Sequence, residues 1–211
     1  GVTPVSDCRV SATSRMSRLG RGVELASSIE VERLLDNPIA YYTLGEPEGS
    51  TQAADTSGNN QPPLKMAGTG TDVVFGSATG PAGDDLTAAT FAGGKRLQAD
   101  LFEPPVELTI ECMFNSSSAP GYGQRLAQCS GYGLALSTTG GLQLLQGTTV
   151  IVASGSGYND GATHHVAATI TATTAELFIN GASAGTAATT PTFVTGVDAG
   201  GYGPDILPPV A

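Results

Sequence analysis

Two segments near the end of the chain constrain its fold more than any other feature. They are residues 160–167, with the sequence DGATHHVA, and residues 176–181, with the sequence ELFING. The first predicts a turn followed by a strand. The second predicts a strand that ends in an Asn-Gly hairpin turn, because only glycine and small residues such as Asn tolerate the positive φ of such a turn. The pair favours antiparallel β structure.

The composition also favours an all-β fold. Aromatic residues make up 6% of the chain, Trp is absent, and there are 29 Gly and 13 Pro residues. This mixture suits short strands joined by many turns better than packed helices. Apolar runs alternate with turn clusters roughly every ten residues, as expected for two stacked antiparallel sheets. The predicted strands are residues 41–44, 72–75, 87–91, 106–114, 126–129, 133–137, 142–145, 150–154, 164–171, 175–179 and 193–197.

The first 36 residues differ in character from the rest. They hold five basic and five acidic residues, so the whole net charge of −10 lies beyond them. Residues 5–13 are predicted to form a short strand. Ser27 is followed three residues later by Glu30, which predicts a capped helix that runs to about Asp36 and ends before Pro38. We therefore expect an N-terminal strand-helix extension over residues 1–37 and a main domain over residues 38–211. The extension has too little apolar surface to fold alone, so we expect it to dock on the sandwich or on another protein.

Charge and hydropathy exclude some partners. A formal net charge of −10 argues against nucleic acid and anionic membrane surfaces, whose binding depends on Lys and Arg. No apolar run approaches the roughly 18 residues of a membrane span, and the sequence contains no charged segment followed by an apolar one of the kind that forms a leader. The sequence thus predicts neither nucleic-acid binding nor membrane insertion.

The three cysteines do not predict a disulfide framework. Cys8, Cys112 and Cys129 are odd in number and have unrelated spacings, and no spacing matches a metal site. Two interpretations stay open for Cys112 and Cys129, which are either buried thiols or a bridged pair on adjacent strands.

Several motifs resemble laminin G-like jelly rolls of the concanavalin A-like superfamily. Residues 160–167 and 176–181 are similar to the signatures D-G-x-W-H-H-V-A and L-Y-x-D-G of that family. In family order, residues 38–46 (PIAYYTLGE) resemble the opening strand, residues 54–59 (ADTSGN) the D-x-S-G-N turn, and residues 108–114 (LTIECMF) the F-T-I-E-A-W-V strand. The resemblance covers about residues 38–200. It implies an antiparallel two-sheet jelly-roll sandwich of a family that mostly binds rather than catalyses.

The chain departs from this family in two places. Tyr42, Met113 and Thr163 stand where relatives usually carry Trp, so no indole is available to stack on sugars. The family also closes with a strand beside the opening strand, which the three prolines of residues 204–211 cannot supply. The resemblance thus implies that the closing strand is missing, so that either the chain continues or another subunit fills that edge. The start at Gly1 without Met fits a fragment or a processed product.

A second resemblance concerns the layout of the whole chain. Residues 7–19 (DCRVSATSRMSRL), followed by a helix and the opening strand, are similar to minor tail proteins of long-tailed bacteriophages. This similarity implies a structural, adhesive tail protein: residues 1–36 attach to other virion tail proteins within a homo-oligomeric assembly, and the jelly roll faces host-surface glycans or a neighbouring subunit. Such a protein is assembled in the host cytoplasm and resides in the virion. The alternative is an extracellular laminin G-like module, binding carbohydrate or protein, of a secreted bacterial or eukaryotic protein.

The adjacent histidines His164 and His165 suggest metal or acid-base chemistry. Neighbouring residues of a strand point to opposite faces, so the two cannot share one ion or one substrate. We expect one to pack in the core and the other to face outward. Neither a G-x-S-x-G elbow nor an H-E-x-x-H helix is present.

Three glutamates are the candidates for glycoside hydrolysis. Glu103, Glu107 and Glu111 would share one face of a regular strand, but Pro104 and Pro105 break that regularity. The E-x-D-x-x-E strand of related glucanases is also missing. The sequence therefore predicts that the protein is not an enzyme, and a hydrolase or lyase is the third hypothesis.

Four tyrosines in glycine-rich segments are the candidate ligand-binding residues: Tyr122, Tyr132, Tyr158 and Tyr202. A tyrosine on such a loop presents a large amphipathic ring at little rotamer cost, although the ring can also simply cover the end of a sheet.

Asp55, Asn59 and Asp72 are the candidate calcium ligands, since some relatives bind calcium near this turn. Calcium needs ~6 to 8 oxygen ligands, and the segment 55–59 equally well forms an Asx turn without an ion. No other cofactor is predicted.

Overall fold

The computed structural model describes residues 28–67, 73–81, 87–92, 96–99, 107–118, 123–190 and 197–199. The chain divides into two compact units, Gly1–Asn37 and Pro38–Ala211. Each is described by itself. No helix among the described residues is long and apolar enough to cross a membrane. The predicted strand at residues 5–13 and the predicted cap Ser27 lie outside the described residues.

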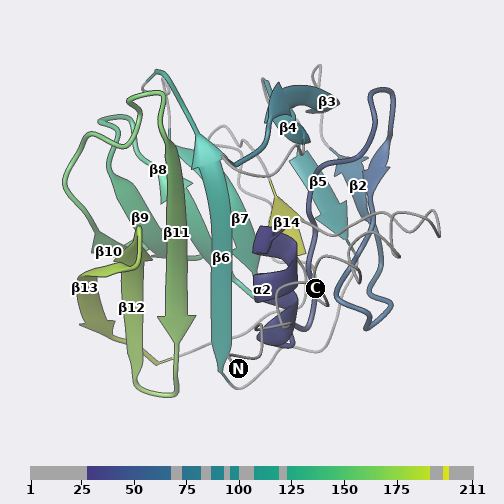
Figure 1. Ribbon diagram of the computed structural model, residues 1–211. Coiled ribbons are helices and arrows are strands. Elements are labelled where there is room, and N and C mark those ends of the chain that lie inside the picture. Colours follow the sequence, from purple (N-terminus) through teal and green to yellow (C-terminus); the bar gives the residue numbers. More distant parts are fainter. Residues whose placement is uncertain are drawn as a thin grey trace, which may run out of the picture. The chain divides into compact units, whose positions relative to one another are not determined.

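The described part of the first unit is the helix α2, which spans Ser28–Leu35 (Figure 1). Glu30 lies in its first turn and Arg33 in its last turn, where each charge complements the helix dipole. Beyond the helix, Asn37 donates its amide to a carbonyl oxygen of the last turn at 3.2 Å and has a left-handed φ of 52°. Pro38 follows and cannot continue a helix. The predicted helix and its end are confirmed.

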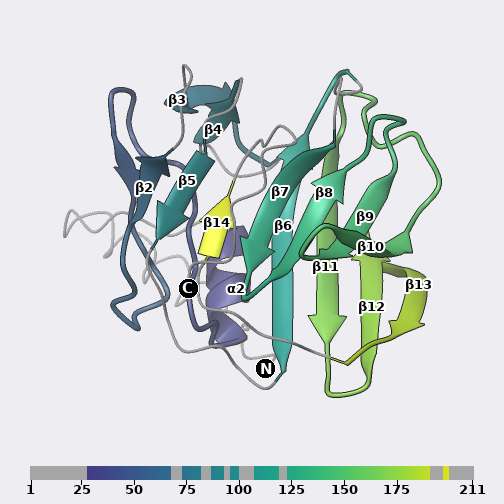
Figure 2. The ribbon, with the colours of Figure 1, turned by 180° about the vertical axis from the view of Figure 1, so that it is seen from behind.

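The second unit consists of antiparallel strands in two main sheets and one ribbon (Figures 1 and 2). Sheet A has the order β1-β2-β5-β14-β7-β8-β9-β10, sheet C has the order β13-β12-β11-β6, and β3 pairs with β4. The predicted all-β jelly-roll sandwich is confirmed. The strands are β1 (Gln52–Ala53), β2 (Leu64–Ala67), β3 (Val73–Thr79), β4 (Thr87–Phe91), β5 (Arg96–Ala99), β6 (Leu108–Asn115), β7 (Gln124–Cys129), β8 (Tyr132–Leu136), β9 (Leu142–Gln146), β10 (Thr149–Ala153), β11 (Thr163–Ile170), β12 (Thr174–Ile179), β13 (Ala182–Ala188) and β14 (Val197–Ala199).

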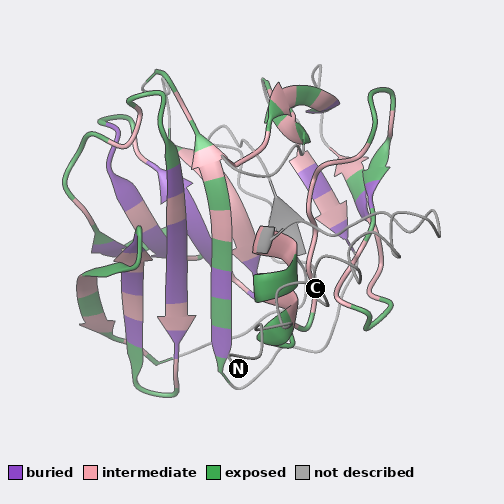
Figure 3. Cartoon of the chain, in the orientation of Figure 1, coloured by how far each residue is buried: buried purple, intermediate pink, exposed green. Residues whose placement is uncertain are grey.

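The main core lies between sheet C and the β7–β10 part of sheet A. Alternate residues of each strand face it, which gives the buried stripes of Figure 3. Leu134, Val166 and Leu177 have no exposed surface at all. Each such side chain stabilises the fold by roughly 1.5–3 kcal/mol relative to an exposed position.

A second core lies beneath the other half of sheet A. Leu64 of β2 and Leu97 of β5 pack there with Phe75 of β3, and all three are at most 1% exposed. Tyr42 packs against this cluster and donates its hydroxyl to the carbonyl oxygen of Pro62 at 2.7 Å. Burial, helped by the nearby charge of Asp55, raises the pKa of Tyr42 to about 12. Tyr42, which stands where relatives of the resembled family usually carry Trp, therefore has a structural role.

Some predicted strands are wrong or missing. Residues 41–44 form no strand, because the backbone of Tyr41 pairs with a turn instead: its amide donates to Asp55 at 2.9 Å and its carbonyl oxygen accepts from the Thr56 amide at 2.8 Å. The sequence did not predict β2, β5 or β13. β2 and β5 are only four residues long, which is too short for their apolar alternation to stand out, and β13 consists almost entirely of small residues.

The last described strand, β14, lies inside sheet A. It pairs with β5 on one side and with β7 on the other. Because residues 41–44 belong to no sheet, the predicted absence of a closing strand beside them stays a prediction.

Cys112 and Cys129 are thiols and are not bridged to each other. Cys112 lies on β6 of sheet C and Cys129 on β7 of sheet A. Burial, with a smaller contribution from the charge of Glu111, raises the pKa of the Cys112 thiol to about 12. Cys129 is buried and Cys112 is half-buried, and both are thiols that pack in or against the main core. Cys8 lies outside the described residues.

Candidate recognition site

Three loops meet at one end of the sandwich and form the candidate site. They are residues 116–118 after β6, residues 137–141 between β8 and β9, and residues 154–162 between β10 and β11. The Gly161 amide donates to the carbonyl oxygen of Ser116 at 2.8 Å. The amides of Gly157 and Tyr158 donate to the carbonyl oxygen of Gly140 at 3.1 and 2.9 Å. These bonds fix the three loops relative to one another, so their side chains are presented from a rigid frame.

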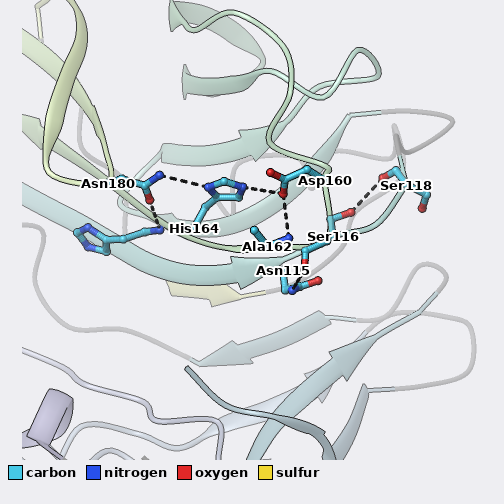
Figure 4. A network of polar contacts seen from close by, with 9 residues as sticks. Asn115, Ser116, Ser118, Asp160, Ala162, His164 and Asn180 are labelled. Carbon is cyan, nitrogen blue, oxygen red and sulfur yellow. Dashed lines mark hydrogen bonds and ion pairs between the residues drawn. The ribbon is translucent and has the colours of Figure 1, made fainter. Parts of the chain in front are cut away.

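A polar network anchors the longest of these loops to the sheet (Figure 4). Oδ1 of Asp160 accepts a hydrogen bond from the Ala162 amide at 2.8 Å and lies 3.0 Å from Nε2 of His164. Nδ1 of His164 lies 3.3 Å from Nδ2 of Asn180, whose Oδ1 accepts the His165 amide at 3.0 Å. The Nδ2 atom of Asn180 can only donate, so Nδ1 of His164 accepts and its Nε2–H donates to Asp160. The hydrogen bonds from Ala162 and His164 lower the pKa of Asp160. The loop thus presents a fixed carboxylate.

Tyr158 is the predicted ligand-binding tyrosine that the structure places in this site. Its ring is half-buried and meets the His164 ring edge-on, with 5.2 Å between the ring centroids and an interplanar angle of 87°. His164 also packs against Phe114 at 5.8 Å. The Tyr158 ring is therefore held in one orientation by packing, as a preorganised contact surface requires.

The rim around Tyr158 is polar. Hydroxyl groups and one carboxylate are exposed there, on all three loops, and no Lys or Arg lies in their described residues. Such groups donate and accept hydrogen bonds to hydroxyl-rich ligands. The exposed rim residues are Ser117, Ser118, Thr138, Thr139, Ser156 and Asp160.

The two histidines do not act together. His164 is buried at 8% exposure, whereas His165 points to the other face of sheet C, where its Nε2 lies 3.1 Å from Oε2 of Glu111. One histidine packs and the other faces outward, as the strand geometry predicts. Glu103 lies outside the described residues. Over the part of the chain that the structure describes, no three His, Cys, Asp or Glu side chains are grouped so as to hold a metal ion.

Asp55 lies in the turn between β1 and β2, outside the three loops, and both of its carboxylate oxygens accept hydrogen bonds from its own chain. Oδ1 accepts the amides of Tyr41 and Ser57 at 2.9 and 3.1 Å, and Oδ2 accepts the Ser57 hydroxyl at 2.8 Å and the Gln61 amide at 3.0 Å. Burial opposes ionisation, but these hydrogen bonds outweigh it and lower the pKa of Asp55.

The second predicted calcium ligand, Asn59, points its amide nitrogen toward the carbonyl oxygens of Pro38 and Ile39, at 2.9 and 3.2 Å. This geometry satisfies the Asx-turn interpretation of Asp55 and Asn59. Asp72 lies outside the described residues, and the calcium interpretation stays a prediction.

The structure corrects the prediction that Tyr132 is a ligand-binding residue. It is 0% exposed within the main core, because the turn at Ser130 and Gly131 makes it the first inward-facing residue of β8. Its ring cannot touch a ligand at the surface. Tyr122 and Tyr202 lie outside the described residues.

Sequence reasoning missed the part that Asn180 plays. It identified Asn180 only as a turn residue, which is correct for its backbone, since φ is 50°. The side chain also bonds two residues of β11 and so fixes His164. An Asn, rather than a second Gly, at this turn position was the available signal, because Asn tolerates a left-handed backbone and also has a hydrogen-bonding side chain.

A sequence profile described as "Concanavalin A-like lectin/glucanases superfamily" matches residues 92–202, which is more than half of the chain. No curated protein matches the sequence.

Solved structures share the fold at low sequence identity. Domain 4 of AbnA, an extracellular arabinanase from Geobacillus stearothermophilus solved in complex with arabinotriose, superposes with a TM-score of 0.51 at 16% identity over 79% of this chain and 86% of that domain. A Trypanosoma rangeli sialidase gives 0.50 at 12% identity, with 81% of this chain but only 28% of the sialidase covered. A structure of botulinum neurotoxin type C, whose cell entry depends on two ganglioside molecules, gives 0.50 at 13% identity, with 82% and 45% covered. At such identities the likeness is one of fold.

Proposed function

This chain belongs to the concanavalin A-like lectin/glucanase superfamily, and on that premise we propose that it is a non-catalytic module that binds carbohydrate. The supporting observation is the loop cluster, where the half-buried Tyr158 ring is fixed by packing and surrounded by exposed hydroxyl groups and the Asp160 carboxylate. An aromatic ring offers an apolar face to a sugar at little cost in rotamer entropy, and the rim hydrogen-bonds its hydroxyls. A shallow site of this kind binds weakly, so several copies on one particle would raise the avidity.

The placement of Asp160, the carboxylate of the loop cluster, relative to Glu111 supports binding without turnover at this cluster. Glycoside hydrolysis needs two carboxyl groups on either side of one bond, ~5 to 9.5 Å apart. Asp160 and Glu111 contact histidines that point to opposite faces of sheet C, so they do not flank a common substrate.

A glycan array followed by calorimetric titration tests this proposal. We expect saturable binding to at least one glycan class, and we expect Tyr158→Ala to weaken it by about tenfold, as for a central contact residue. Thr173→Ala, at an exposed position in the hairpin between β11 and β12, is the matched control and should bind like the unmodified chain. A chain that binds no glycan, or whose Tyr158→Ala variant binds unchanged while folded by circular dichroism, would refute the assignment.

A more specific role rests on the first unit. On α2, Val31 is 49% exposed and Leu35 is 80% exposed. An apolar stripe on a helix is stable when another surface covers it. This supports a role like that of phage minor tail proteins, with residues 1–36 attached to other virion tail proteins in a homo-oligomeric assembly. The unbridged thiols Cys112 and Cys129 fit assembly in a cytoplasm.

Limited proteolysis separates this role from its alternative. In the isolated chain we expect rapid cleavage within residues 1–37, and protection when the chain is assembled with its tail partners. An extension that resists protease on a monomeric chain would contradict anchoring. The alternative, a binding module of a secreted protein, gains support if native protein purified under thiol-trapping conditions carries a bridge between Cys112 and Cys129.

A further inference from the structure

The sequence contains one Asn-Gly pair and one Asp-Gly pair, and both contact the same histidine. They are Asn180-Gly181, in the hairpin between β12 and β13, and Asp160-Gly161, in the loop before β11. Nδ2 of Asn180 lies 3.3 Å from Nδ1 of His164, and Oδ1 of Asp160 lies 3.0 Å from Nε2 of the same ring (Figure 4). Such pairs are reactive because glycine has no Cβ, so its amide nitrogen can approach the side chain before it.

At Asn180 this approach leads to deamidation. The Gly181 nitrogen attacks Cγ of Asn180 and closes a succinimide ring. The Cγ–Nδ2 bond breaks, and Nδ2 leaves as ammonia with the proton of the Gly181 amide. Water then opens the ring at either carbonyl carbon, which gives aspartate or isoaspartate. At Asp160 the same ring forms with loss of water from the protonated carboxyl group, and water reopens it to the same two products.

The structure holds the side chain of Asn180 on the neighbouring strand. Asn180 and Gly181 have φ values of 50° and 80°, both positive as in a type I′ hairpin turn. Oδ1 of Asn180 accepts the His165 amide at 3.0 Å, while Nδ2 donates to Nδ1 of His164. Ring closure moves Cγ onto the Gly181 nitrogen and carries Oδ1 and Nδ2 with it, so both hydrogen bonds have to break first. The reaction therefore requires a local opening of the hairpin.

Asp160 is held back at three points. The Gly161 amide, which would attack, donates to the carbonyl oxygen of Ser116 at 2.8 Å. Oδ1 of Asp160 is engaged by the Ala162 amide and by His164. The hydrogen bonds from Ala162 and His164 also lower the pKa of Asp160, so the carboxylate stays ionised and has no protonated oxygen to lose as water. Asp160 is therefore the slower of the two sites.

The two residues are linked through the tautomer of the ring between them. Because Asp160 accepts the Nε2–H of His164, Nδ1 carries no proton and accepts from Asn180. Without Asp160 the proton can move to Nδ1, which then faces the Nδ2 donor of Asn180 with a donor of its own. Asp160 therefore supports the contact that holds Asn180.

We infer that Asn180 is a deamidation site and that His164, in the tautomer that Asp160 fixes, controls its rate. Aspartate at this position has no Nδ2 donor for His164, and isoaspartate adds a methylene group to the backbone of the turn. Either product removes the bond between Asn180 and His164, the residue on which the Tyr158 ring packs. The inference involves only atoms of this chain, so it holds whether or not the chain binds carbohydrate.

Peptide mapping by mass spectrometry tests this on the folded full chain after incubation in a mildly alkaline buffer. Deamidation appears as the mass gain of exchanging NH2 for OH in the peptide that contains Asn180. His164→Phe keeps a ring against Phe114 and Tyr158 but has no nitrogen atoms. We expect Asn180 to convert about fivefold faster in this variant, which is the change in open population that the loss of one hydrogen bond produces.

Two controls separate the contact from general stability. Leu97→Ala weakens the second core, to which His164 does not belong, and should speed the conversion of Asn180 less than His164→Phe does. Asn59, which Asn60 follows in the turn near Asp55, is the internal reference and should keep its rate in the His164→Phe chain.

Three outcomes would overturn the inference. The first is an unchanged rate at Asn180 in a His164→Phe chain that is folded by circular dichroism. The second is equal acceleration by Leu97→Ala, which would mean that global unfolding sets the rate. The third is a native chain that converts as fast as the same chain in urea. If His164→Phe does not fold, Asp160→Ala decides, since position 160 is exposed: faster conversion of Asn180 supports the inference and an unchanged rate contradicts it.

Discussion

Replacement of Asp55 by Ala measures how much one carboxylate stabilises the start of the second unit. The carboxylate accepts four hydrogen bonds, which join Tyr41, Ser57 and Gln61 around one turn. Water also reaches this group, so each bond is worth about 0.5–1 kcal/mol rather than the larger value of a buried one. Three backbone amides lose their partner in the variant. We therefore expect Asp55→Ala to lower the free energy of unfolding by about 2–3 kcal/mol.

Urea unfolding followed by circular dichroism and tyrosine fluorescence is the assay, since the chain has no Trp. Asp55→Asn keeps one acceptor oxygen and should lose about half as much. Glu48→Ala, at an exposed position nearby, is the control and should change stability by less than about 0.5 kcal/mol. A loss below about 0.5 kcal/mol for Asp55→Ala would refute the reasoning.

The effect of Asp55 should depend on pH in a defined direction. Its pKa is lowered in the folded state, so its contribution is complete above the unfolded pKa of about 3.9 and disappears as the pH falls through the folded value. The difference between the unmodified chain and Asp55→Ala should therefore shrink below about pH 4. Added calcium should leave the urea midpoint of unfolding unchanged at pH 7. If calcium instead raises the midpoint of the unmodified chain and not that of Asp55→Ala, the turn binds the ion.

Other variants test the core, a thiol and the hairpin. Leu134→Ala should destabilise the sandwich by about 2–5 kcal/mol in urea unfolding, because the side chain is fully buried; a loss under about 1 kcal/mol would contradict the core assignment. Cys112 should resist iodoacetamide at pH 8 in the native chain and react after unfolding, as mass spectrometry can show, because its pKa is raised to about 12. Asn180→Val should cost more stability in urea unfolding than Asn180→Gly, because a branched side chain disfavours a φ of 50°, whereas equal losses would mean that only the side-chain hydrogen bonds matter.

The sequence predicts strands best where one strand carries a clear alternation. In β11, His164, Val166 and Ile170 face the core, and the amino-acid sequence alone displays this alternation. β5 contains only two apolar residues, Leu97 and Ala99, and an alternation this short does not distinguish a strand from a loop in the sequence. Residues 41–44 are predicted to be a strand but are not one. They are largely apolar, yet the backbone of Tyr41 hydrogen-bonds to Asp55 and Thr56 of a turn instead of to a neighbouring strand.

The sites are harder to predict because they combine residues from different strands. Tyr132 has glycine neighbours like Tyr158, yet one is buried and the other half-exposed, because the hairpin decides which way each ring points. The contact of His164 with Asn180 depends on the pairing register of β11 and β12, which the sequence does not state. Local motifs therefore locate turns well, whereas surfaces that span a sheet emerge only from the register.

The central claim is that this sandwich binds carbohydrate and leaves it intact. Titration of the chain with the glycan that it binds best, followed by chromatographic sizing of the same sample after prolonged incubation, tests both halves at once. We predict a saturable heat of binding and an unchanged length distribution of the glycan. Shortened glycan, or a full panel without any heat of binding, would contradict it.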